Sequence, residues 1–189
     1  PGDERWFADG RVLPGLARSA GPSTSGERSL QLVPHPAVPA GLALLDAPDI
    51  DSVVAGNREL AAQLLAAADL WVFVTTAARY ADAVPWELLH TAQRRGTALA
   101  VVCNRVPPPA MREVMDHLGQ MLAEGGLSRA ALFGVPEVAL TGGFIPARAV
   151  APLRDWLLGL AADAAARAEV VRATLDGALR SMSERVPAR

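Results

Sequence analysis

The chain has 189 residues, of which 51% are hydrophobic and 20% are charged, a composition that excludes an intrinsically disordered protein. No apolar segment reaches the roughly 18 residues that a transmembrane helix needs, and the net charge of -2 gives no reason to expect nucleic acid or an anionic membrane as a partner. All 18 basic residues are arginine, so the chain contains no lysine.

Cys103 is the only cysteine, which rules out an internal disulfide and favours a reducing, cytoplasmic setting. No secretory leader is visible, and the sequence begins at Pro1 without an initiator methionine, so we expect a fragment of a longer protein. Cys103 ends an apolar run, and no local signature connects it to His35, His90 or His117. We therefore expect a buried structural cysteine and not a nucleophile.

The first 28 residues are rich in glycine, proline, serine, aspartate and arginine, and they predict an irregular entry segment. Two short apolar runs follow, at residues 30–33 and 41–45, separated by three prolines. This pattern predicts two adjacent strands in antiparallel pairing. The second run leads directly into Asp46.

From residue 52 to residue 135 the chain alternates between helix and strand patterns. Helical periodicity covers residues 52–68, 85–95 and 110–124, and apolar runs typical of buried strands cover residues 70–75, 98–103 and 131–135. This alternation predicts βαβ units and a mostly parallel sheet with helices on both faces, which is an α/β fold. Ligands of such sheets bind beyond the carboxyl ends of the strands, where the sequence places Asp46, Thr75, Thr76, Asn104, Pro136 and Glu137.

From Pro152 onward, apolar residues recur with a period near 3.6 as far as Val186. This stripe predicts one helix of about 35 residues, which at 1.5 Å per residue is about 50 Å long. A compact domain of this size does not need so long a helix. We therefore expect a domain over residues 1–160 and a helical extension over residues 161–189, which could bind a protein partner or associate with a second copy.

Two polar motifs follow the predicted strands. In Asp46-Ala47-Pro48-Asp49 a strand-end carboxylate could hold a water of a Mg²⁺ shell, and the turn could offer a backbone N–H to a phosphate. The alternative is an acidic turn that caps the next helix, since aspartate is common in turns. Asn104-Arg105 is likewise either a ligand-binding strand end or an ordinary turn.

The order of these elements and motifs resembles the GTPase domain of the dynamin-like and Era-like bacterial GTPases, over roughly residues 30–160. The switch-II motif of that family is Asp-x-x-Gly, and the matching stretch is Asp46-Ala47-Pro48-Asp49. The base-specificity motif is Asn-Lys-x-Asp, and the matching stretch is Asn104-Arg105-Val106-Pro107. The resemblance implies a three-layer α-β-α fold like that of the P-loop NTPases, with a mostly parallel sheet and here a long C-terminal helix.

The resemblance also implies ligands and roles. GTP or GDP and Mg²⁺ would bind, with Asp46 holding Mg²⁺ through water and the backbone from Ala47 through Pro48 to Asp49 moving with the γ-phosphate. Asn104 and Arg105 would hold the base, Arg105 by stacking on it. Asp46 and Asp49 would then be the catalytic residues, and hydrolysis would proceed by positioning and charge stabilisation without a covalent intermediate.

Three departures from the family pattern change these expectations. Asp49 replaces the switch glycine, and Pro107 replaces the aspartate that accepts the guanine N1 and N2 hydrogens. No lysine is present to complete a phosphate loop, so we expect that loop to lie upstream and the 189 residues to hydrolyse little GTP by themselves. The alternative function is a nucleotide-independent interaction module with a GTPase-like fold. A third alternative is a response-regulator or phosphatase-type domain that uses Asp46 and Asp49. The response-regulator type requires a lysine at a later strand end, and the chain has none.

Overall fold

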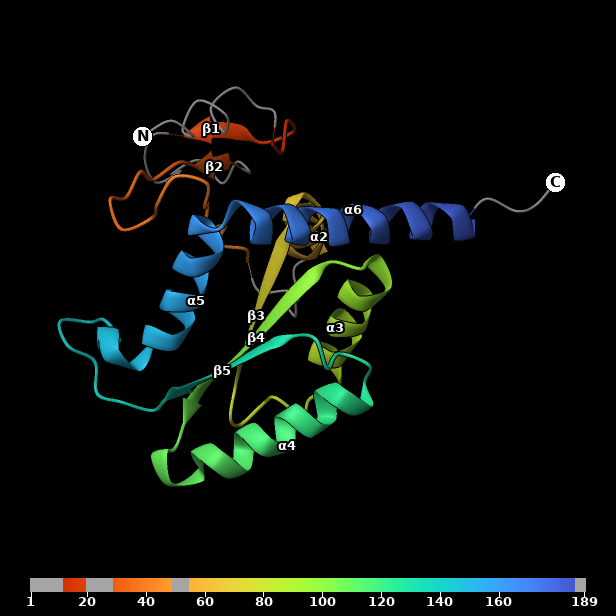
Figure 1. The fold of residues 1–189 in the computed structure, drawn as a ribbon. Helices are drawn as coiled ribbons and strands as arrows, with labels where there is room; N and C mark the ends of the chain where they lie inside the picture. Colours follow the sequence, from red (N-terminus) through yellow and green to blue (C-terminus); the bar gives the residue numbers. More distant parts are fainter. Residues whose placement is uncertain (1–11, 20–28, 49–54, 186–189) are drawn as a thin grey trace. The chain divides into compact units, whose positions relative to one another are not determined.

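The computed structural model describes residues 12–19, 29–48 and 55–185 (Figure 1). The chain divides into two compact units, Pro1–Ala68 and Asp69–Arg189. The described residues form a mixed α/β structure in which the strands of two sheets run parallel, as the alternating pattern predicts. Among these residues, no helix is long and apolar enough to cross a membrane.

The described residues of the first unit form a small sheet and a helix. β1 (Ala17–Ser19) and β2 (Ser29–Gln31) pair in parallel over three residues each. The helix α2 (Ala55–Ala67) buries Ala61 and Leu64, which lie one turn apart on the same side. This helix confirms the periodicity that predicts a helix over residues 52–68, within the part of that range that the structure describes.

The predicted antiparallel pair of strands is wrong in both partner and direction. β2 pairs with β1 and not with residues 41–45, and residues 42–48 adopt no regular secondary structure. Leu44 and Leu45 are 63% and 39% exposed. A strand forms only beside a neighbouring strand, and among the described residues of the first unit residues 42–48 belong to no sheet. Asp46 therefore does not end a strand.

The second unit is built on a three-stranded parallel sheet in the order β3-β4-β5 (Figure 1). The strands are β3 (Leu70–Thr76), β4 (Ala98–Val106) and β5 (Ala131–Pro136), and they are connected by α3 (Ala83–Arg95) and α4 (Met111–Glu124). All five elements confirm the predicted ones. β4 lies in the middle and is buried along most of its length, which explains its nearly continuous apolar sequence.

Helices pack on both faces of β5. A Cβ atom on Gly134 would lie 2.7 Å from the Sδ of Met111 and 2.9 Å from the Sδ of Met115, so α4 approaches the strand closely at this glycine. The preceding side chain along the strand, Phe133, points to the opposite face because strand residues alternate. Its ring lies 5.3 Å from the ring of Trp156, in the C-terminal part of the chain.

The C-terminal region forms two helices and not the single long helix that the sequence predicts. After the 3₁₀ turn Ala147–Ala149 come α5 (Ala151–Ala162) and α6 (Ala164–Arg185), separated by Asp163, whose backbone is extended (φ -93°, ψ 106°). The Asp163 carboxylate accepts hydrogen bonds from the N–H groups of Ala165 and Ala166 at 2.8 and 3.1 Å and so caps α6. The apolar periodicity continues across this break, which is why the pattern predicts one helix.

One side of α6 packs against the end of α3 within the second unit. A Cβ atom on Gly177 would lie 1.9 Å from the carbonyl oxygen of Arg95 and 2.5 Å from the Cα of Gly96, so the two backbones are in direct contact. Gly96 ends α3 in the left-handed conformation (φ 66°), as its position after the helical pattern predicts. Elsewhere on α6, the Thr174 hydroxyl donates to the carbonyl oxygen of Asp69 at 2.9 Å.

Candidate functional site

The carboxyl ends of the three parallel strands bring their last residues to one edge of the sheet. Thr76 of β3 lies opposite Asn104 of β4, and the N–H of Ala77 donates to the Asn104 carbonyl oxygen at 3.0 Å. On the other side of β4, the N–H of Glu137 donates to the Val106 carbonyl oxygen at 2.8 Å. The structure thus brings together the residues that the sequence places at the ends of these three strands.

A bulge interrupts β4 at Asn104 and Arg105. The pairing of β4 with β5 is regular up to Cys103 and then shifts before Val106 pairs with Pro136. Arg105 is in the left-handed conformation (φ 53°), which costs a non-glycine residue on the order of 1–2 kcal/mol. The Asn104 Oδ1 accepts a hydrogen bond from the Arg105 N–H at 2.8 Å, which offsets part of this cost. Backbone strain and bulges are concentrated next to functional sites.

The side chains at this edge present complementary polar groups. Arg105 and Glu137 are exposed, and with the described residues neither side chain makes a hydrogen bond or an ion pair. Asn104 is half-buried and uses its Oδ1 for the backbone, so its Nδ2 donors remain for a ligand. A guanidinium plane, an amide and a carboxylate at one strand edge can bind a planar polar ligand by stacking and hydrogen bonding.

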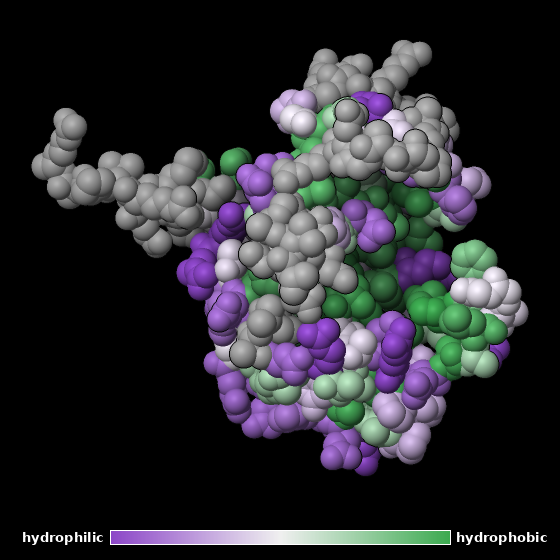
Figure 2. Space-filling view, turned by 180° about the vertical axis from the view of Figure 1, so that it is seen from behind, coloured by the Kyte–Doolittle hydropathy of each residue, from purple (hydrophilic) through white to green (hydrophobic). Residues whose placement is uncertain are grey.

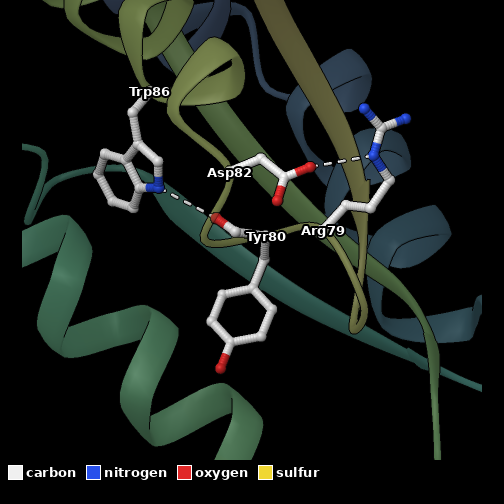
Figure 3. A network of polar contacts seen from close by, with 4 residues as sticks. All are labelled: Arg79, Tyr80, Asp82 and Trp86. Atoms are coloured by element: carbon white, nitrogen blue, oxygen red, sulfur yellow. Dashed lines mark hydrogen bonds and ion pairs between the residues drawn. The ribbon is translucent and has the colours of Figure 1, made fainter.

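The loop between β3 and α3 is fixed beside this edge (Figure 3). Arg79 donates from Nε to the Asp82 carboxylate at 3.1 Å, and Trp86 donates from Nε1 to the Tyr80 carbonyl oxygen at 3.0 Å. The Tyr80 hydroxyl also lies 2.8 Å from the Nδ1 of His117 on α4. Tyr80 and Trp86 thus hold the loop in place through these contacts.

A second loop at this edge, between β5 and α5, contains a tight turn that is not among the predicted elements. Thr141 and Phe144 exchange two backbone hydrogen bonds of 2.8 and 3.1 Å around Gly142 and Gly143, both of which have positive φ. The turn leaves Phe144 78% exposed and Leu140 61% exposed. In Figure 2 this loop is the mostly green projection at the right edge. The Gly-Gly pair is the signal that would have predicted it.

The acidic turn lies in the first unit, whereas the strand edge belongs to the second. Asp46 and Ala47 are exposed, Pro48 is half-buried, and Asp49 lies outside the described residues. Because no strand precedes Asp46, its role at a metal site depends on the sequence motif alone. Among the residues described, no group of three or more His, Cys, Asp or Glu side chains could hold a metal ion. A single exposed carboxylate still fits Mg²⁺, which keeps most of its water ligands in proteins.

Cys103 is completely buried in β4. Burial raises the pKa of its thiol, because removal from water disfavours the thiolate. A buried neutral thiol is a poor nucleophile, so the structure agrees with the structural role expected for this cysteine.

No protein-family model, no curated protein and no solved structure matches the chain. The likeness to the bacterial GTPases therefore depends on the motifs and on the order of the elements.

Proposed function

We propose that the chain is part of the GTP-binding and GTP-hydrolysing domain of a dynamin-like or Era-like bacterial GTPase with a three-layer P-loop-NTPase-like fold. The observation that carries the proposal is the strained Arg105 at the carboxyl edge of the sheet, between the ends of β3 and β5. Its exposed guanidinium can stack on a purine base, and the Asn104 Nδ2 can donate to an acceptor on the edge of that base.

In the proposed GTPase, the triphosphate and the metal would be bound by the acidic motif and by a phosphate loop. Asp46 would hold Mg²⁺ through a water molecule, and the backbone from Ala47 to Asp49 would move with the γ-phosphate. Because the chain has no lysine, the main phosphate contacts would come from sequence outside these 189 residues. The chain alone would then bind GTP weakly, with a dissociation constant on the order of 1 mM, which corresponds to about 4 kcal/mol.

Nuclear magnetic resonance tests this proposal at the weak affinity expected. We would titrate the ¹⁵N-labelled chain with GTP and Mg²⁺ and expect amide shifts at residues 76–77, 104–106 and 137. Arg105→Ala should weaken GTP binding at least tenfold. The control is Arg112→Ala, which removes an exposed arginine that belongs to α4 and not to a strand end, and should leave the affinity for GTP unchanged. The absence of shifts at these strand ends with about 5 mM GTP, several times the expected dissociation constant, would refute the proposal.

GTP turnover tests the missing phosphate loop separately. We expect the chain alone to hydrolyse GTP at a rate close to the uncatalysed one, because binding energy for the transferred phosphate is absent. Turnover within about tenfold of typical kcat values would contradict the idea that the phosphate loop lies outside the chain.

A second candidate function is a nucleotide-independent interaction module with the same fold. Pro107 favours it, because this exposed residue has no side-chain acceptor at the position where the family binds the guanine ring. The GTP titration separates the two candidates, since an interaction module would show no localised shifts with the nucleotide.

A further inference from the structure

The outer face of α6 exposes a row of large apolar side chains. Val171, Leu175 and Leu179 are 48%, 57% and 52% exposed, and their spacing of four residues places them along one side of the helix. Leu175 and Leu179 each lie about 160° around the helix from Gly177, which contacts α3. Figure 1 shows α6 running past the end of the sheet. A continuous exposed apolar row of this kind marks an interaction surface.

Two opposite charges run beside this row. Arg172 and Asp176 each follow an apolar residue of the row by one position, and both are exposed. They are four residues apart on one helix, yet they form no ion pair with each other or with the other described residues. Arginine before aspartate is the less favourable order for a pair within a helix, which leaves both charges for a partner.

We propose that α6 pairs in antiparallel orientation with α6 of a second copy of the chain, centred on Leu175. Val171 then faces Leu179 of the second copy, so that the apolar rows cover each other. Along the first helix, Arg172 lies three residues before Leu175. Because the second helix runs in the opposite direction, its Asp176 lies level with position 174 of the first helix. The two residues therefore differ by two positions, or about 3 Å along the axis at 1.5 Å per residue. The twofold symmetry forms this ion pair twice.

The charges also exclude the parallel arrangement. In a parallel pair, Arg172 and Asp176 of the second copy would be four residues, or about 6 Å, apart along the axis and on opposite sides of the apolar seam. Only the antiparallel pair brings unlike charges together on the same side. The surface is small, since the apolar row spans about 12 Å, so we expect a dissociation constant on the order of 100 µM.

Sedimentation equilibrium of the full chain from about 10 µM to about 1 mM tests the association. We expect the apparent mass to rise toward twice the monomer mass. Leu175→Asp should raise the dissociation constant at least tenfold, whereas Ala173→Asp should leave it unchanged, because Ala173 is exposed on α6 outside the row and the substitution introduces the same charge. A chain that stays monomeric throughout this range, or an unchanged equilibrium in Leu175→Asp, would overturn the proposal.

Charge exchange tests the orientation. Arg172→Glu and Asp176→Arg should each weaken self-association severalfold, because each places like charges together twice. An equimolar mixture of these two variants should associate like the wild type through the mixed pair. The double variant should recover in part, because its contacts again join unlike charges while Glu before Arg also favours an ion pair within its own helix. Circular dichroism establishes that each variant keeps its helix. If neither the mixture nor the double variant recovers, the antiparallel pair is wrong.

Discussion

The contact between α6 and the end of α3 requires a glycine at position 177. In Gly177→Ala, the added Cβ would lie 1.9 Å from the carbonyl oxygen of Arg95 and 2.5 Å from the Cα of Gly96, and both are backbone atoms that cannot rotate away. A non-bonded contact needs about 3.5 Å, so the helix would have to move away by more than about 1 Å. Overpacking of this kind costs about 1–3 kcal/mol, which the gain in helix propensity from alanine, about 1 kcal/mol, offsets in part. We expect a net loss of up to about 2 kcal/mol in the free energy of unfolding.

Urea unfolding followed by circular dichroism and tryptophan fluorescence measures this loss. The matched control is Gly159→Ala in α5, where the added Cβ would have no atom within 4 Å apart from its chain neighbours and the backbone of its own helix. There alanine gains helix propensity without a clash, and we expect the free energy of unfolding to rise by about 0.5–1 kcal/mol. If Gly177→Ala stabilises the chain as much as Gly159→Ala does, α6 does not pack against α3 through this glycine.

Three further predictions concern single side chains. Arg105→Gly should raise the free energy of unfolding by up to about 1 kcal/mol, because glycine adopts positive φ without strain, while the same titration with GTP should show weaker binding. Asp163→Ala should lower the free energy of unfolding by about 1 kcal/mol and reduce the helical circular dichroism, because it removes the cap of α6, whereas Asp163→Asn should retain most of both. Because burial raises the pKa of the Cys103 thiol, the stability that the neutral thiol contributes is complete below the usual pKa of about 8.5 and is lost as the pH rises through the higher pKa of the folded chain. The free energy of unfolding should therefore fall at alkaline pH more steeply in the wild type than in Cys103→Ala, and equal slopes would show that the thiol is not the cause.

The second unit could be predicted from the sequence because its signals are local and agree with one another. β4 is a nearly continuous apolar run, α4 has helical periodicity, and glycine follows each of the helices α3 and α4. Few folds other than a parallel sheet with crossover helices are compatible with a short alternation of such strands and helices.

The predictions failed or were incomplete where the local structure depends on a distant partner or on a polar contact. The run at residues 41–45 is apolar enough for a strand, but strand formation depends on a neighbour that sequence periodicity does not reveal. The break between α5 and α6 depends on two hydrogen bonds to one carboxylate, and the apolar pattern is insensitive to them. The bulge at Arg105 depends on a shift in register against β5, which only the assembled sheet defines.

The two motifs of the proposed function differ in how far the structure supports them. Asn104 and Arg105 now have a geometric basis, since the strand ends and the strained backbone place them at the sheet edge. The strand predicted before Asp46 does not form, so the proposed role of Asp46 depends on the sequence motif alone. If base contacts dominate binding by this chain, guanosine and GTP should have similar affinities, and chelation of Mg²⁺ should change neither. A preference for GTP that requires Mg²⁺ and disappears in Asp46→Ala would instead show that the acidic turn already contacts the phosphates without a lysine-containing loop.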